Sequence, residues 1–151
     1  SFNLNKGLGA PLGAILAGSR DAIAEAVRVR QMFGGGWRPA GIPAAAGVVA
    51  METMVERLGE DHRTAKQLAT GLSAIEGIGA DPSTTETNIV LARAHSVAPD
   101  TLAARLAIQG VLVLPFGAGI RLVTHHEITQ DAVETTLAAV RTVLAGVKRD
   151  L

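Results

Sequence analysis

The first residues of the chain alternate between apolar and polar side chains. Residues 2–6 follow this period of two, and Lys6 shares the parity of the apolar positions, which predicts a strand running into a turn at residues 7–9. A short apolar run at residues 15–17, bounded by glycine, predicts a second, buried strand. We expect the two strands to form a hairpin around Pro11.

Helical spacing follows the predicted hairpin. Apolar residues recur every three or four positions over residues 21–33, which predicts a helix with Ser19 or Asp21 near its N-terminus. Three glycines at residues 34–36 end this helix. A run of three glycines is either a flexible joint or a place where the backbone approaches another group closely. A second helix is expected over residues 43–58. Its small side chains predict that it is deeply buried or forms a subunit contact.

The character of the chain changes near residue 58. From Glu56 onward charged residues become frequent, while Leu68, Leu72 and Ile75 mark one apolar face of a helix. We therefore place a domain boundary near residues 58–60, within or between two helices.

The remainder predicts an α/β unit. Leu102 and Leu106 lie on one face of a helix that ends at Gly110. The last helix, with Thr129 as its N-cap, carries apolar residues at alternating spacings of four and three, which is typical of a core-facing stripe. The predicted elements are strands at residues 88–94, 111–114 and 120–124, a turn at residues 116–119, and helices at residues 99–109 and from Thr129 to about Lys148.

Composition narrows the functional classes. Of 151 residues, 48% are hydrophobic and 19% charged, which indicates a globular protein. The 14 basic and 14 acidic residues balance, which argues against nucleic acid as a partner. There is no cysteine, which fits a cytoplasmic protein, and apolar runs stop well short of the roughly 18 residues of a membrane span. No signal peptide is evident, and the abrupt start without Met suggests an absent upstream part.

Lys6 is the first candidate for chemistry. Apolar strand residues precede it, glycines flank the following turn, and a second apolar strand follows. We expect this surrounding to desolvate the lysine partly, which favours the neutral amine, the nucleophile that forms a Schiff base with an aldehyde. The alternative is an ordinary surface lysine after a strand.

Arg121 is the second candidate. Strand alternation predicts that Ile120, Leu122 and Thr124 share one face and that Arg121 and its alternate neighbours share the other. An arginine inside an apolar strand is costly unless it meets an anion, and its planar fork suits a carboxylate. The alternative is an edge-strand arginine bonded to a nearby acidic side chain.

Arg38 is the third candidate, because it follows a glycine-rich loop and precedes a helix, as phosphate-binding residues often do. Glycine-rich hinges are common, so a simple hinge is the alternative. No histidine or carboxylate cluster has the spacing of metal ligands, and we expect no metal site.

Taken together, these segments resemble the threonine aldolase and β-eliminating lyase family of fold-type-I pyridoxal-phosphate (PLP) enzymes. The resemblance extends from Asn5 to about Leu144 and depends on the order and spacing of short motifs. The motifs are Lys6-Gly7-Leu8-Gly9-Ala10-Pro11-Leu12-Gly13, Leu16-Ala17-Gly18-Ser19, Arg28 to Gly41, Arg57-Leu58-Gly59-Glu60-Asp61-His62, Glu86-Thr87-Asn88-Ile89-Val90 and Ile120-Arg121-Leu122-Val123-Thr124-His125.

The resemblance implies roles for four residues. Lys6 matches the lysine that forms the Schiff base with PLP, and Arg121 matches the arginine that holds the substrate's α-carboxylate. Arg38 matches an arginine near the cofactor phosphate, reached across a dimer interface. Asn88 belongs to the substrate carboxylate site and helps to position Arg121.

The resemblance also implies a fold and a reaction. The expected fold class is α/β, in which residues 1–58 form the end of the PLP-binding large domain and dimer-contact helices. Residues 59–151 form a small C-terminal α+β domain with an antiparallel sheet. The expected reaction is retro-aldol cleavage of a β-hydroxy-α-amino acid of the L-threonine or L-allo-threonine type to glycine and an aldehyde.

Two departures and one absence qualify the resemblance. Asn5 stands where the family usually has serine, and Gln31 where a basic residue is common. In the family, the N-terminal half carries the aromatic residue that stacks on the PLP ring, the Asp that pairs with its nitrogen, the Gly-Thr loop that binds its phosphate and the candidate base histidines. The expected partners are therefore that missing half, an amino-acid substrate and a second copy in a homodimer or homotetramer. The alternatives are an inactive C-terminal fragment or dimerisation remnant and, on the βαβ-like pattern alone, a ligand-binding regulatory domain.

Overall fold

The computed structural model describes residues 1–147. They divide into two compact units, Ser1–Leu58 and Gly59–Leu151. The mixture of helices with antiparallel strands agrees with the predicted α/β class. No helix in the described range combines the length and the apolar character needed to cross a membrane.

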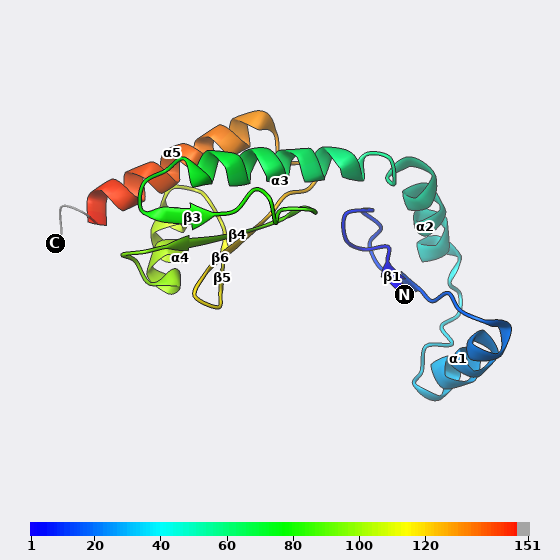
Figure 1. Cartoon of the computed structure of the whole chain (residues 1–151). Helices are drawn as coiled ribbons and strands as arrows, with labels where there is room; N and C mark the ends of the chain where they lie inside the picture. Colours follow the sequence, from blue (N-terminus) through cyan, green and yellow to red (C-terminus); the bar gives the residue numbers. More distant parts are fainter. Residues whose placement is uncertain (148–151) are drawn as a thin grey trace. The chain divides into compact units, whose positions relative to one another are not determined.

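The first unit contains a short hairpin and two helices (Figure 1). Strand β1 (Phe2–Asn3) pairs antiparallel with β2 (Ala14–Ile15), so the predicted hairpin is confirmed. Helix α1 (Arg20–Met32) is capped by the Ser19 hydroxyl, which accepts from the Ala22 N–H at 3.3 Å. Helix α2 (Gly41–Thr53) begins two residues before the predicted start.

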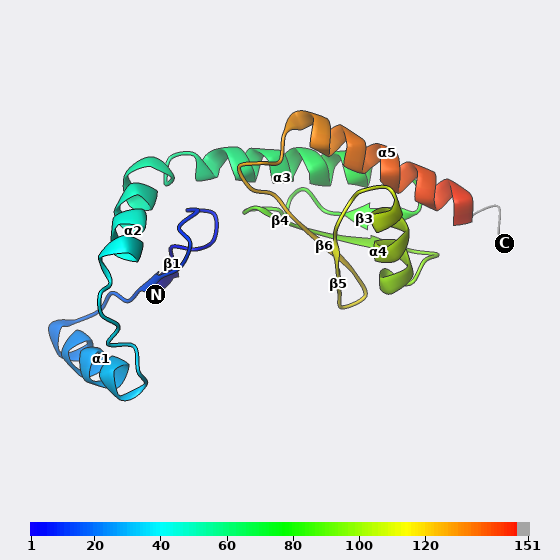
Figure 2. The ribbon, with the colours of Figure 1, turned by 180° about the vertical axis from the view of Figure 1, so that it is seen from behind.

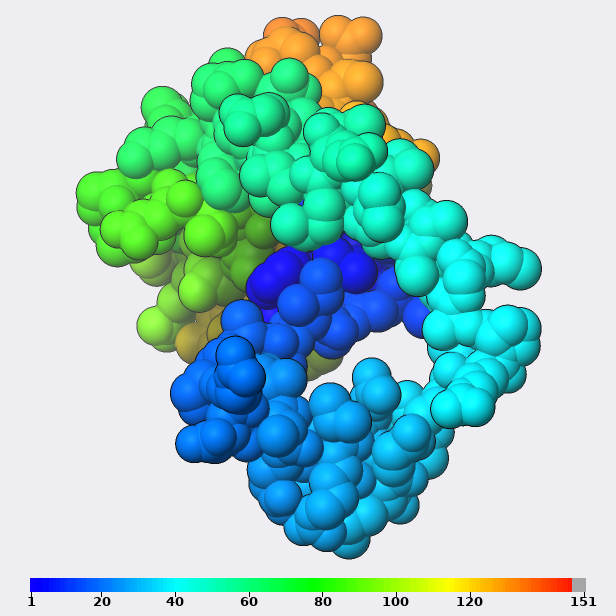
Figure 3. Space-filling model, turned by 90° about the vertical axis from the view of Figure 1, so that its right-hand side faces the viewer, coloured from blue at the N-terminus to red at the C-terminus, as the bar shows by residue number. Residues whose placement is uncertain are grey.

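One burial prediction for the first unit is wrong, and another is tested only in part. The second strand was expected to be buried, but both strands of the hairpin are exposed. Helix α2 was expected to be deeply buried or in a subunit contact. Within the described chain only Gly47 and Ala50 are buried on it, so deep burial is not found and the subunit contact stays a prediction. The reason is that the core of this unit is small, and Figure 3 shows α1 and α2 at the surface of the face that it presents. The core consists of Leu4, Leu8, Ala10 and Ala50, with Met54 and Leu58 packed against it.

The second unit is a four-stranded antiparallel sheet with three helices. The order of strands is β3-β4-β6-β5, which places β6 in the interior of the sheet. Strands β4 and β5 are joined through α4 and both run antiparallel to β6, which gives a split β-α-β arrangement. The elements are α3 (Leu58–Ser73), β3 (Ile78–Ala80), β4 (Ile89–Ala94), α4 (Pro99–Ile108), β5 (Leu114–Phe116), β6 (Gly119–Val123) and α5 (Gln130–Val147).

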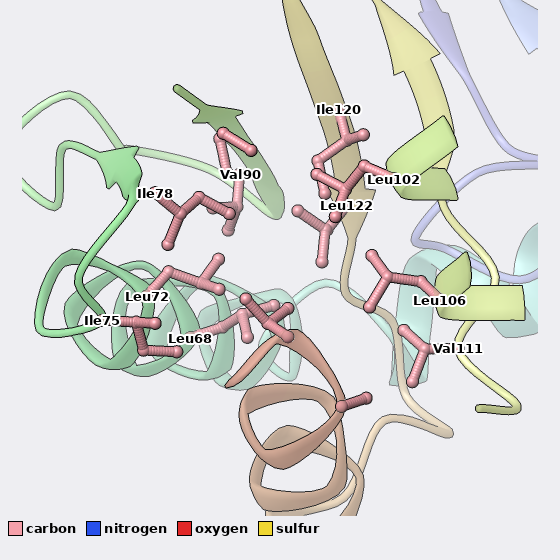
Figure 4. Close-up of a cluster of buried hydrophobic side chains, with 14 of the residues drawn as sticks. Leu68, Leu72, Ile75, Ile78, Val90, Leu102, Leu106, Val111, Ile120 and Leu122 are labelled. Carbon is pink, nitrogen blue, oxygen red and sulfur yellow. The ribbon is translucent and has the colours of Figure 1, made fainter. Parts of the chain in front are cut away.

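Period-two burial explains why the sheet has one covered face. In β6 the side chains of Ile120 and Leu122 are buried, whereas Arg121 is half-buried and Val123 is exposed. The three helices pack on the buried face, and leucines from α3 and α4 meet the strand residues there (Figure 4). Helices α3 and α5 lie side by side, since a methyl group at Gly71 would overlap the Leu137 side chain (Figure 2).

The structure corrects the boundary of one predicted strand and adds a strand that was not predicted. Residues 111–114 were predicted as a strand, but β5 begins at Leu114. The Val111 N–H donates to the Leu106 carbonyl, so Val111 takes part in the turn that follows α4 and does not pair with a strand. Strand β3 was not predicted, since three residues containing a glycine carry no period-two signal. The Thr129 N-cap and the apolar stripe of α5 are confirmed, whereas the predicted end at Lys148 lies outside the described residues.

Candidate active-site residues

Lys6 lies in a tight loop whose buried side faces α2. The Gly9 N–H donates to the Lys6 carbonyl at 2.8 Å, and the Ala10 N–H donates to the Leu4 carbonyl at 3.0 Å. Gly9 has a φ of 74°, a value that a residue with a side chain rarely adopts. The loop therefore has a backbone fixed by its own hydrogen bonds.

The expected desolvation of Lys6 is not found. Leu4, Leu8 and Ala10 occupy the buried side of the loop, and the lysine side chain lies on the exposed side. Within the described part of the chain, no acceptor or carboxylate pairs with its amine. The local packing thus holds the backbone of Lys6 while its amine stays open to solvent.

Arg121 lies on the open face of the sheet, midway along β6. It pairs across the sheet with Leu91 of β4 on one side and with Leu114 of β5 on the other. The side chain is half-buried, and no carboxylate among the described residues pairs with it. The edge-strand alternative is therefore wrong, because β6 is an interior strand and leucines flank the arginine.

The open face of the sheet is largely apolar. An arginine surrounded in this way has its guanidinium held near the surface with few competing partners, which favours an incoming anion. The large apolar side chains exposed there are Ile89, Leu91, Leu114, Phe116 and Val123.

Asn88 joins the ends of two strands rather than facing Arg121. Its Nδ2 donates to the Thr124 carbonyl at 2.8 Å, and its own carbonyl accepts from the Thr124 N–H at 2.9 Å. Asn88 pairs with Thr124 in register, and Thr124 shares the buried parity of Leu122, opposite to that of Arg121. Asn88 therefore lies near Arg121 along the paired strands, but its side-chain amide already donates to the Thr124 carbonyl.

Arg38 lies in the segment that connects α1 to α2 and is exposed. The glycines before it pack back against α1: a methyl group at Gly35 would meet the Arg30 side chain, and one at Gly36 would overlap the Gln31 amide. These glycines therefore closely approach side chains of α1, the helix that precedes them. No anionic side chain of the described range pairs with Arg38.

The four predicted residues are divided between the two units. Lys6 and Arg38 belong to the first unit, and Arg121 and Asn88 to the second. The structure brings Arg121 and Asn88 onto neighbouring hydrogen-bonded strands. It also shows a residue that the sequence did not single out, Thr124, which is 1% exposed and contacts both Asn88 and Asp61.

One hollow of the second unit is shallow and has both charged and apolar side chains in its lining. It measures about 480 Å³ and includes Arg93, Phe116 and Asp81 in its lining. The Ser83 hydroxyl and N–H donate to the Asp81 carboxylate and lower its pKa from the ordinary value. Among the described residues, no group of three histidine or acidic side chains is arranged to hold a metal ion.

The fold is shared with two solved structures. A Listeria monocytogenes protein assigned as an L-allo-threonine aldolase superposes with a TM-score of 0.73 at 19% identity, covering 93% of this chain and 43% of that one. An aminotransferase from Streptoalloteichus hindustanus gives a TM-score of 0.56 at 21% identity, covering 68% and 37%. At these identities the likeness supports the fold alone.

Curated sequences show the closer relationship. The chain is 37% identical to low-specificity L-threonine aldolase 1 of Arabidopsis thaliana over 139 residues, which is 89% of this chain and 39% of the relative. It is 38% identical to the low specificity L-threonine aldolase of Escherichia coli K12 over 142 residues, which is 94% and 41%. This chain thus spans about two fifths of the length of these relatives.

The family assignment follows from the first two thirds of the sequence. The model of the β-eliminating lyase family matches residues 1–95, which include the Lys6 loop, the glycine-rich segment and strand β4. The match covers more than half of the chain, and the fold agrees with it. The chain belongs to the β-eliminating lyase family.

Proposed function

We propose that this chain is the C-terminal part of a PLP-dependent aldehyde-lyase. The substrate is a β-hydroxy-α-amino acid of the L-threonine or L-allo-threonine type, which is cleaved to glycine and an aldehyde. The observation that carries the proposal is Arg121, a half-buried guanidinium between two leucines on a central strand, with no carboxylate partner among residues 1–147. The similarity to low-specificity L-threonine aldolases supports the reaction class.

The described residues fit a PLP site in part. Lys6 offers an exposed amine, without a partner among the described residues, on a loop with a fixed backbone, as a covalent anchor for an aldehyde requires. Arg121 offers a carboxylate-binding fork, and Asn88 acts through the strand ends rather than by direct contact. Arg38 is assigned to the cofactor phosphate, which its exposed position in the glycine-rich segment permits.

In this proposal each residue has a separate task. PLP, when bound, supplies the electron sink that accepts the pair left by Cα–Cβ cleavage. Lys6 would hold the aldehyde of the cofactor through Nζ. Arg121 would bind the substrate carboxylate and so orient the amino acid about its Cα.

The proposal also assigns the two units and the assembly. Residues 1–58 belong to the PLP-binding large domain and residues 59–151 to the small C-terminal domain. The missing N-terminal half completes the site, in a cytoplasmic homodimer or homotetramer. The cysteine-free sequence supports the cytoplasmic location. The exposed apolar side chains of α2 support the homodimer or homotetramer.

Covalent trapping of PLP on the chain tests the lysine directly. After incubation with PLP and reduction with borohydride, we expect mass spectrometry of peptides to find the pyridoxyl group on Lys6. Lys6→Ala should abolish the label, whereas Lys66→Ala, at an exposed lysine of α3, should leave it unchanged. Equal labelling of Lys6 and Lys66, or labelling that survives Lys6→Ala, would contradict the role of Lys6.

The second candidate is an inactive dimerisation remnant of such an enzyme. It is favoured by the exposed apolar side chains on α2, among them Ile42, Val48 and Val49. This reading predicts a stable dimer with no selective labelling of Lys6. Aldehyde release from L-threonine by the chain joined to its N-terminal half would exclude it.

A further inference from the structure

Thr124 is a buried residue with all of its polar groups engaged. It is 1% exposed and follows directly after β6. Its N–H donates to the Asn88 carbonyl at 2.9 Å, and its carbonyl accepts from the Asn88 amide at 2.8 Å. Its hydroxyl donates to the main-chain carbonyl of Asp61 at 2.7 Å, and the Asn88 carbonyl oxygen is 3.4 Å from the same hydroxyl.

These bonds join three segments that are far apart in sequence. Asn88 immediately precedes β4, Thr124 immediately follows β6, and Asp61 lies in the first turn of α3. The hydroxyl bond spans 63 positions of sequence. Asp61 itself is 2% exposed, so water does not compete freely for this contact.

The location of the bond gives it a consequence for Arg121. Helix α3 starts at Leu58, where the chain leaves the unit that carries Lys6. The Thr124 hydroxyl therefore ties the strand that carries Arg121 to the first turn after that junction. Strand pairing fixes β6 against β4 and β5, and apolar packing holds the sheet against the helices. The Thr124 bond adds a directional polar contact between the end of β6 and the first turn of α3.

We propose that Thr124 is a positioning residue for Arg121, acting through the register of β6 against the first turn of α3. This inference rests on the proposed function, in which Arg121 holds the substrate carboxylate. Arg121 lies three residues before Thr124 on the same strand, so a displacement of the strand end moves the guanidinium. Alignment of a bound substrate is sensitive to shifts of about 1 Å.

The test compares Thr124→Val with Thr124→Ser in the enzyme completed by its N-terminal half. Valine keeps the shape of threonine and removes the hydroxyl donor, whereas serine keeps the donor and removes a buried methyl group. We expect Thr124→Val to raise KM for the amino acid roughly tenfold with much less change in kcat. Thr124→Ser should keep a KM near the wild-type value, although it loses stability.

Thr136→Val is the matched control. The Thr136 hydroxyl donates to the Ala132 carbonyl at 2.8 Å within α5, and the residue is half-buried in the same unit. Its removal should leave KM unchanged. If Thr124→Val does not fold, Thr124→Cys, with a weak donor in place of the hydroxyl, should show the same rise in KM.

The outcomes separate this inference from the function on which it rests. A wild-type enzyme that releases aldehyde, together with an unchanged KM in Thr124→Val, overturns the role of Thr124 alone. A KM that rises equally in Thr124→Ser and Thr124→Val also overturns it, because the effect then follows packing rather than the donor. A wild-type enzyme that releases no aldehyde from β-hydroxy amino acids overturns the proposed function and this role with it.

Discussion

Arg121 is the residue of the second unit on which the proposed substrate binding depends. Arg121 is held between Leu91 and Leu114 on a sheet face that the helices of this unit leave open. A guanidinium in an apolar surrounding gains more from a carboxylate than one in water does, because the local dielectric is lower. This position agrees with the carboxylate-binding role that we propose for Arg121.

Substitution of Arg121 should affect substrate binding more than turnover. In the completed enzyme we expect Arg121→Ala to raise KM about 10- to 100-fold, the value of a lost charge-assisted hydrogen bond. Steady-state kinetics with L-threonine would measure it. Arg93→Ala serves as control, because Arg93 is exposed on β4 with the parity of Leu91 and has no assigned role. An equal rise in KM for both variants would show a general charge effect and would remove Arg121 from the site.

At the scale of elements, the pairing of β4 with β6 depends on a close backbone approach. Gly119 starts β6, and a methyl group there would overlap the carbonyl oxygen of Ala92 on β4. Backbone cannot move aside as a flexible side chain can. A glycine is thus required at this end of the strand that carries Arg121.

We therefore expect Gly119→Ala to lower the free energy of unfolding by about 2 kcal/mol, as overpacking does. Urea denaturation followed by circular dichroism would measure the change. Gly146→Ala in α5 is the matched control, because nothing lies within 4 Å of the added methyl group. That variant should gain about 0.5 kcal/mol from helix propensity. Equal free energies of unfolding in the two variants would show that β4 and β6 can accommodate the added methyl group without loss of stability.

At the scale of the whole molecule, the two units differ in their cores. The first unit buries four apolar residues, Leu4, Leu8, Ala10 and Ala50, whereas the second has a continuous core from all three helices and the sheet. Burial of apolar surface is the main favourable term in folding. The second unit therefore has the means to fold by itself, and the first does not.

Expression of the two units as separate fragments tests this difference. We expect residues 59–151 to unfold in one cooperative transition in urea, with helical and strand signal by circular dichroism. Residues 1–58 alone should show no cooperative transition, because so small a core does not offset the loss of chain entropy. Cooperative unfolding of residues 1–58, or a disordered fragment 59–151, would contradict the division into a self-sufficient small domain and a dependent segment.

The sequence by itself determined most of the elements and the family. Periodic apolar spacing located α1, α3, α4 and α5, and the Ser19 and Thr129 caps were identified, because capping and amphipathic spacing are local properties. Alternation in β6 assigned Arg121 to the face opposite Ile120 and Leu122, since successive strand residues point to opposite faces. The motifs indicated the family that the match over residues 1–95 establishes.

Only the tertiary structure decided the features that depend on distant partners. The exposure of Lys6 and of β2 follows from how little the first unit buries, which no local pattern reveals. The interior place of β6 depends on strand order, and it removed the edge-strand alternative for Arg121. The contact of Thr124 with Asp61 joins residues 63 positions apart, so it exists only once α3 and β6 have packed together.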